Sequence, residues 1–180
     1  MKEISLHILD IVQNSIAAKA KKVEIIIAEK VKKNLLKIII NDDGTGMNKK
    51  EQKEVLDPFV TSRTTREVGL GLPFLKKAAE NCNGKLTIDS QKGEGTNLEV
   101  EFQYDHIDRA PLGDIVGTII SLLTTNPQLD FIYKHRYNGK EFEFNTYSLK
   151  KEIEGVNINH PEIINWIDEY LKENLREVRQ

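Results

Sequence analysis

The chain has 180 residues, which is enough for one domain or for one domain with a small appendage. With 39% hydrophobic and 30% charged residues and a net charge of −2, it has an ordinary globular composition and no bulk attraction to nucleic acid or to an anionic membrane. Its single cysteine, Cys82, excludes a disulfide framework within the chain and fits a reducing compartment, where we expect it to pack at a helix end. The first 15 residues interrupt their apolar positions with polar ones, so they predict neither a signal peptide nor a membrane span, and we expect a cytoplasmic protein.

The first predicted element is a helix that Ser5 caps and that runs to about Ala20. Residues three and four apart are neighbours on a helix surface, so His7, Asp10 and Asn14 form a polar stripe beside the apolar one. A solvated face is one interpretation, but such faces usually carry Lys and Glu, which come later in this chain. The apolar stripe itself consists of Ile8, Leu9, Val12 and Ile16.

Two β-branched runs follow, at residues 23–27 and 35–41, and they predict an antiparallel pair of strands. The second run ends in the sequence NDDGTG, residues 41–46, which places paired carboxylates and two glycines directly after a buried strand. These residue types are the usual ones for a turn, and they also suit a binding site at a strand end. The local pattern leaves both interpretations open.

The next segment predicts a short helix near residues 49–56, a loop to residue 72, a helix that ends at Asn83–Gly84, and a hairpin formed by residues 85–90 and 97–102. The loop ends in EVGLGL, residues 67–72, immediately before the second of these helices. Glycines let backbone amides approach an anion, and a helix N-terminus offers unpaired N–H groups, so this loop predicts a phosphate site. A tight turn into the helix is the alternative.

Residues 108–180 carry no chemical motif. They predict an amphipathic helix with Ile115, Ile119, Leu122 and Leu123 on its apolar face, a hairpin that turns at Asn138–Gly139, and two helices, the last from Pro161 to about Val178. The seven aromatic residues between 131 and 166 indicate a small core, and a partner-docking surface is the alternative. His106, His135 and His160 are expected at the surface or in turns, and no histidine belongs to a metal-ligand cluster.

From about residue 6 to residue 102 the chain resembles the ATPase domain shared by gyrase B subunits, heat-shock chaperones, histidine kinases and MutL-type mismatch-repair proteins. The resemblance implies an α+β fold of the Bergerat type, a two-layer sandwich whose mixed, largely antiparallel sheet has helices on one face. We expect an ATP-binding domain over residues 1–105 and a small α/β appendage over residues 108–180, used for partner docking or dimerisation. Five motifs occur in the family's order: LDIVQNS, DDGTG, DPFVTS, GLGL and GEGTNLEVEF.

The resemblance implies that Asp42 accepts the exocyclic amine of adenine, with Thr96 supporting it through a shared water. It also implies that Gly44 and Gly46 let the backbone pass close to the base, and that Asn14 ligates Mg²⁺ through its amide oxygen. His7 is expected at the rim of the nucleotide pocket. The full predicted ATP-binding set is Asn14, Asp42, Gly44, Gly46, Met47, Phe59, Ser62, Arg63, Arg66, Gly69, Leu70, Gly71, Leu72 and Thr96.

Asp10 occupies the position at which hydrolytic relatives carry a glutamate that activates water. Its side chain is one methylene shorter, and the lid carries Glu67 where histidine kinases have a glycine, so slow hydrolysis is expected. About five residues precede the first helix, so no phosphoacceptor domain is expected before it. The expected function is ATP·Mg²⁺ binding by a histidine-kinase-like module that controls a protein partner or its own homodimer. An active kinase of the histidine or anti-sigma serine type, acting on a separate chain, and a non-catalytic nucleotide-binding protein are the alternatives.

Overall fold

The computed structural model describes residues 3–59 and 71–180, and within them one mixed sheet carries the fold. The strand order is β3-β4-β2-β1-β5-β6, and all neighbours are antiparallel except β1 and β5. The strands are β1 (Lys22–Lys30), β2 (Leu35–Asp42), β3 (Lys85–Gln91), β4 (Gly95–Gln103), β5 (Asp130–Tyr137) and β6 (Lys140–Asn145). This confirms the predicted α+β sandwich with a largely antiparallel sheet.

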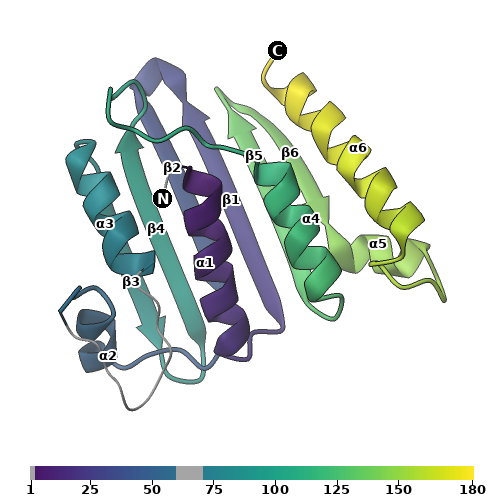
Figure 1. Ribbon diagram of the computed structural model, residues 1–180, viewed down its shortest axis with the longest axis horizontal. Helices are drawn as coiled ribbons and strands as arrows, with labels where there is room; N and C mark the ends of the chain where they lie inside the picture. Colours follow the sequence, from purple (N-terminus) through teal and green to yellow (C-terminus); the bar gives the residue numbers. More distant parts are fainter. Residues whose placement is uncertain (1–2, 60–70) are drawn as a thin grey trace.

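The helices lie over one face of this sheet, where α1, α3 and α4 run side by side and α6 follows at the C-terminal side (Figure 1). The helices are α1 (Ile4–Ala17), α2 (Lys49–Glu54), α3 (Gly71–Asn81), α4 (Ile115–Thr125), α5 (Thr146–Glu152) and α6 (Pro161–Val178), and a 3₁₀ turn, η1 (Val31–Lys33), joins β1 to β2. Among the described residues no helix has the length and apolar character that crossing a bilayer requires.

Alternating side chains explain why only one face of the sheet is covered. Ile38 of β2 and Val100 of β4 point into the core and are almost fully buried, as their apolar neighbours two residues away are. On the other face Lys37 of β2 pairs with Glu99 of β4 at 2.6 Å between Nζ and Oε2. The helices therefore cover the apolar face, and ion pairs occupy the opposite one.

The C-terminal segment extends the same sheet, because β5 lies parallel to β1 with Ile25 opposite Tyr133. Phe131 and Tyr133 are fully buried and belong to one core with the apolar residues of α1 and β2. Ile26 and Ala28 of β1, on the face that no helix covers, are also buried, and β1 has a neighbouring strand on each side. The domain boundary at residues 105–108 remains a prediction from the sequence, and strands from both sides of it pair in one continuous sheet.

Two predictions about α1 were wrong. Ser5 does not cap α1: Glu3 stands at the N-cap position without a side-chain capping bond, and Ser5 is buried in the first turn of the helix. The helix also ends at Ala17, because Lys19 adopts a left-handed backbone with φ of 62°, which terminates helices.

His135 is not at the surface, because it pairs with a buried carboxylate. Its Nε2 lies 2.7 Å from Oε1 of Glu29, which also accepts from the Arg179 guanidinium at 2.6 Å, while Oε2 accepts from the Tyr104 hydroxyl at 3.0 Å. Tyr133 completes the cluster through its hydroxyl, 2.7 Å from Nδ1 of His135. We call these five residues the Glu29 cluster. It joins β1, the segment after β4, β5 and the C-terminal end of α6.

Candidate nucleotide site

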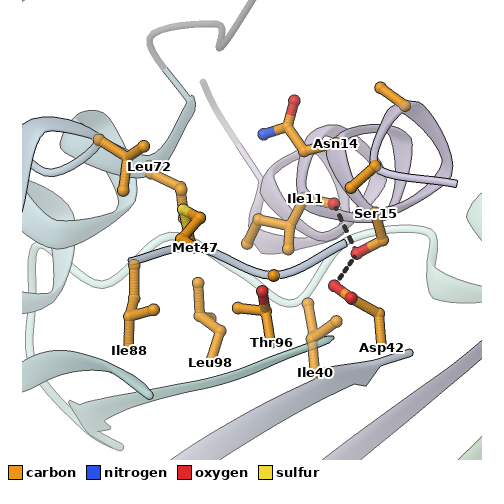
Figure 2. A pocket seen from close by; sticks show the side chains of 14 residues that line it. Ile11, Asn14, Ser15, Ile40, Asp42, Met47, Leu72, Ile88, Thr96 and Leu98 are labelled. Carbon is orange, nitrogen blue, oxygen red and sulfur yellow. Dashed lines mark hydrogen bonds between the residues drawn. The ribbon is translucent and has the colours of Figure 1, made fainter. Parts of the chain in front are cut away.

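A cavity of about 310 Å³ lies under the C-terminal half of α1, between that helix and strands β2 and β4 (Figure 2). Its size falls within the range of small-molecule sites. The wall is largely apolar, which suits the flat face of a ring system, and four polar side chains line it: Asn14, Ser15, Asp42 and Thr96. The apolar side chains that line the cavity are Ile11, Ala17, Ala18, Ile40, Met47, Val55, Leu72, Ile88 and Leu98.

Asp42 is the last residue of β2, and two hydrogen bonds fix its carboxylate. Oδ2 accepts from the Ser15 hydroxyl at 2.6 Å, and Oδ1 accepts from the Gly44 N–H at 2.9 Å (Figure 2 shows the first). An ionised carboxylate has about four acceptor sites, so two protein donors leave capacity for a ligand N–H. The strand end therefore presents a held, acceptor-only group to the cavity.

Thr96 faces Asp42 across the β2–β4 pairing, at the start of β4. Its hydroxyl lies 2.9 Å from Oγ of Ser90, which accepts from the Met47 N–H at 2.8 Å and donates to the Gly95 carbonyl at 2.8 Å. Because the single Ser90 hydrogen is used on Gly95, Thr96 donates to Ser90 and keeps its lone pairs for other partners. Asp42 and Thr96 thus offer neighbouring acceptors that one water can bridge.

The loop after β2 requires its glycines. Gly46 has φ of 64°, and a Cβ at this position would overlap the Gln91 carbonyl. A Cβ on Gly44 would come within 2.9 Å of the Ala18 carbonyl, which already accepts from the Thr45 N–H at 2.8 Å. The glycines therefore let the loop close against both the end of α1 and the β3–β4 turn, which shapes the cavity.

Asn14 and Asp10 lie one turn apart on α1 and are both half-buried. The side-chain amide of Asn14 lines the cavity and makes no hydrogen bond within the described residues. The Asp10 carboxylate instead faces the start of α3, where one of its oxygens is 3.2 Å from the position of a Cβ on Gly71. The polar stripe of α1 therefore faces the nucleotide cavity at Asn14 and the start of α3 at Asp10.

Comparison with known protein families shows which domain this chain carries. Residues 2–106 match the family described as histidine kinase-, DNA gyrase B- and HSP90-like ATPase. The chain belongs to this ATPase family. It carries the family's ATP-binding domain, as the ordered motifs predict, and the described cavity lies at the motif residues.

Similarity to individual proteins of this family is partial. The chain is 32% identical over 96 residues to the sensor-like histidine kinase SenX3 of Mycolicibacterium smegmatis, a match over 51% of this chain and 25% of that protein. It is 35% identical over 86 residues to the autoinducer 2 sensor kinase/phosphatase LuxQ of Vibrio parahaemolyticus, over 44% of this chain and 10% of the other. The chain thus spans a quarter or less of the length of these relatives.

Solved structures support the fold. The MutL ATPase domain of Aquifex aeolicus complexed with ADP superposes with a TM-score of 0.51 at 19% identity, covering 86% of this chain and 68% of that one. The N-terminal domain of a DNA repair protein superposes with a TM-score of 0.57 at 15% identity, covering 79% and 52%. At these identities the likeness extends to the fold alone.

The structure brings together most of the predicted ATPase residues that it describes. Gly44 adjoins the cavity, Gly71 faces Asp10, and the Phe59 side chain is 91% exposed and does not line the cavity. Ser62, Arg63, Arg66, Glu67, Gly69 and Leu70 lie outside the described residues. The predicted residues that line the cavity are Asn14, Asp42, Gly46, Met47, Leu72 and Thr96.

Sequence reasoning missed one polar residue that lines this cavity and misplaced another. Ser15 was overlooked, although a serine within an apolar helical stripe, next to Asn14, is a signal that its hydroxyl has a specific partner. His7 was expected at the pocket rim, but it lies seven residues before Asn14, two helical turns or about 10 Å away, and lines a different cavity.

Proposed function

We propose that this ATPase-family chain binds ATP together with Mg²⁺ and uses the nucleotide to control a separate protein in signalling or another ATP-gated process. The observation that carries the proposal is the Asp42 carboxylate, held at the wall of an apolar cavity by Ser15 and Gly44. An acceptor-only group in that place selects a base with an exocyclic amine over one with a carbonyl. The apolar side chains around it suit the faces of a purine.

Asn14 is our proposed magnesium ligand. Its amide oxygen is a hard donor of the kind Mg²⁺ takes, and the described residues leave that amide without a protein partner. Mg²⁺ keeps several waters and binds nucleotide phosphates, so one protein ligand is a sufficient contribution. The ion would neutralise phosphate charge, while Asn14 would orient the phosphates toward the start of α3.

Asp10 is the proposed general base for slow hydrolysis. It faces the start of α3 one turn before Asn14, on the side where the glycine-rich loop enters that helix. An aspartate reaches about 1 Å less far than a glutamate, and displacements of that size matter for a base that must reach its water directly or through one water. We therefore infer a basal rate at or below the low end of ordinary enzymes, about 1–1000 per second.

A kinase that acts on a separate chain is the second candidate. It is favoured by the names of two partial relatives, a sensor-like histidine kinase and a sensor kinase/phosphatase. Residues 108–180 are the proposed partner-contact or dimerisation segment, and they expose Trp166, which is stacked on Tyr170 of α6 with ring centroids 5.0 Å apart. Aromatic residues of this kind are frequent in protein interfaces.

Incubation with γ-labelled ATP distinguishes these functions. The purified chain is incubated alone and with proteins encoded nearby, and free phosphate and labelled protein are measured. Slow phosphate release that a partner accelerates supports the proposed ATPase module. Label on a second protein supports the kinase. ATP binding with neither product would contradict both and would indicate a non-catalytic nucleotide-binding protein.

A further inference from the structure

The start of α1 is bonded to the segment that leads into α4. The Ile4 N–H donates to the Pro111 carbonyl at 3.0 Å. The Ser5 N–H donates to the Leu112 carbonyl at 2.9 Å. The first N–H groups of a helix have no partner within it, so these two bonds do for α1 what a capping side chain does elsewhere. In Figure 1 the chain between β4 and α4 passes the start of α1 before it reaches α4, and we call its residues 111–114 the strap.

Gly113 lets the strap lie this close to α1. Its φ is 78°, a left-handed backbone that glycine adopts readily. A Cβ at this position would come within 2.6 Å of Oγ of Ser5 and 2.7 Å of Cβ of Glu3, and the Ser5 side chain has no room to move because it is buried. The Glu3 side chain adds a third connection, since its Oε2 accepts from the Asp114 N–H at 3.4 Å. An alanine at residue 113 would therefore displace the strap from α1.

The strap continues directly into the C-terminal segment. Asp114 caps α4, with its Oδ1 accepting from the Gly117 N–H at 2.8 Å. Ile115 and Val116, in the first turn of α4, are buried in the core, and α4 packs against both α1 and α6. A displacement of α4 therefore moves the strap as well.

The opposite half of α1 carries the proposed nucleotide contacts. Asn14 and Ser15 line the nucleotide cavity, and the Ser15 hydroxyl donates to Asp42. About 14 Å of helix separates Ser5 from Asn14, and the backbone bonds between successive turns make a helix of this length a stiff unit. The strap at one end and Asp42 at the other thus hold the same stiff element.

We propose that the strap positions α1 for nucleotide binding and couples the nucleotide site to the C-terminal segment. Gly113 and Glu3 do not line the nucleotide cavity, so they act as positioning residues, through α1, on Asn14 and Asp10. Helix shifts of about 1–2 Å are a common form of such coupling. This role rests on the proposed nucleotide function, and it gives the route by which a partner bound to residues 108–180 would control ATP binding.

Reciprocity provides a test on the wild-type protein. If the bonded strap favours nucleotide binding, bound nucleotide must favour the bonded strap by the same factor. Hydrogen exchange of the ¹⁵N-labelled full chain is followed by NMR with and without saturating ADP and Mg²⁺. Exchange at the Ile4 and Ser5 amides requires their bonds to the strap to open, and it should slow about three- to tenfold when ADP is bound. The Tyr147 amide, which donates to the Asn145 side chain at the start of α5, is the internal reference and should be unchanged.

Gly113→Ala tests the strap directly, and Gly155→Ala is its matched control. Both glycines have φ of 78°, so an alanine introduces similar backbone strain at each, but a Cβ on Gly155 meets nothing within 4 Å. Gly113→Ala should weaken binding of ADP with Mg²⁺ about three- to tenfold, the same factor as the change in exchange. Gly155→Ala should leave the affinity unaltered. Calorimetry gives the affinities, and comparison of the two Tm values separates a loss of positioning from a general loss of stability.

The strap has no positioning role if exchange at Ile4 and Ser5 is unchanged by ADP that calorimetry shows to be bound. Equal slowing at Tyr147 would also overturn the proposal, because it would indicate general stabilisation by a ligand. So would equal ADP affinity in folded Gly113→Ala and Gly155→Ala proteins. The exchange test needs only the wild type, so it decides the matter even if Gly113→Ala does not fold. A chain that binds no ADP would contradict the proposed nucleotide function together with the strap.

Discussion

Asp42 and Glu29 are carboxylates at opposite ends of the paired strands β2 and β1, and their surroundings differ in one respect. Glu29 receives its hydrogen bonds from three side chains, Tyr104, His135 and Arg179, in a site that is closed to solvent apart from 8% of its side-chain surface. Asp42 accepts two hydrogen bonds and faces a cavity. A carboxylate whose acceptor sites are filled by its own protein stabilises the fold, and one with capacity left beside a cavity is available to a ligand.

Removal of Glu29 is expected to have the largest effect and tests the structural half of this comparison. Glu29→Ala leaves His135 and Arg179 without their acceptor, and loss of one partner of a buried pair typically destabilises by about 3–5 kcal/mol. Denaturant unfolding would measure the change. Glu143→Ala, which removes an exposed partner of Lys134, serves as the control and should lower the free energy of unfolding by no more than about 1 kcal/mol. Similar losses in the two variants would show that the cluster has no special role.

Lowering the pH should weaken the stabilisation that the Glu29 cluster provides. Burial alone would raise the pKa of Glu29, but hydrogen bonds from His135 and Arg179 outweigh it and lower the pKa to about 2. A carboxylate with a depressed folded pKa contributes stability that is complete above its unfolded pKa of about 4.5 and is lost as the pH falls through 2. Between pH 5 and pH 2 the wild type should therefore lose about 3 kcal/mol more than Glu29→Gln. Parallel pH profiles of the two proteins would contradict the assignment.

Asp42→Asn tests the proposed ligand-binding role of the second carboxylate. The change replaces an acceptor-only group with one that also donates, so ATP affinity should fall about 10- to 150-fold, the range for loss of a hydrogen bond to a charged group, about 1.5–3 kcal/mol. Calorimetry gives the affinity, and an unchanged Tm confirms folding. Asp43→Asn is the matched control, because the neighbouring carboxylate accepts from the Lys21 and Lys22 N–H groups and does not line the cavity. Equal ATP affinity in a folded Asp42→Asn protein would remove Asp42 from the base-recognition site.

Asn14→Ala is expected to have a smaller and metal-dependent effect. Only the contact to the ion is removed, so affinity for ATP with Mg²⁺ should fall about tenfold, while affinity in EDTA should change little. Gln13→Ala, at the adjacent exposed position, should change neither. Equal losses with and without Mg²⁺ would assign Asn14 a contact to the nucleotide itself.

Substitutions of Asp10 are expected to have the smallest effect, and they test the rate of ATP hydrolysis rather than ATP binding. If reach limits the base, Asp10→Glu should raise basal hydrolysis a few-fold at unchanged ATP affinity, and Asp10→Ala should abolish the basal rate. Phosphate release at saturating ATP measures both. Brisk turnover by the wild type with Asp10 as its essential base would argue against limited reach, and an Asp10→Ala protein with unaltered basal and partner-stimulated rates would exclude Asp10 as the base.

The same two carboxylates show what the sequence could reveal. The position of Asp42 at a strand end beside two glycines was predictable, because the strand, the acid and the glycines are all local in the chain, whereas its role toward a nucleotide came from the family resemblance. The role of Glu29 was not predictable, because its partners are separated from it by 75, 106 and 150 residues and meet only in the folded sheet. His135 was misjudged for that reason, and Ser15 because its importance depends on a contact 27 residues away. Periodicity located the strands and helices, including Pro161 and Val178 as the ends of α6.

The parallel pairing of β1 with β5 has a consequence for how the chain is made. Strands β1 to β4 pair among residues 22–103, whereas β5 adds to β1 only after residue 130 has been synthesised. Until then β1 is an edge strand with unpaired backbone groups and the apolar side chains of Val23, Ile25 and Ile27. Exposed apolar edges recruit other strands and promote aggregation. The C-terminal segment therefore acts as a late cover for a strand formed more than 100 residues earlier, and premature termination would leave an aggregation-prone ATPase domain.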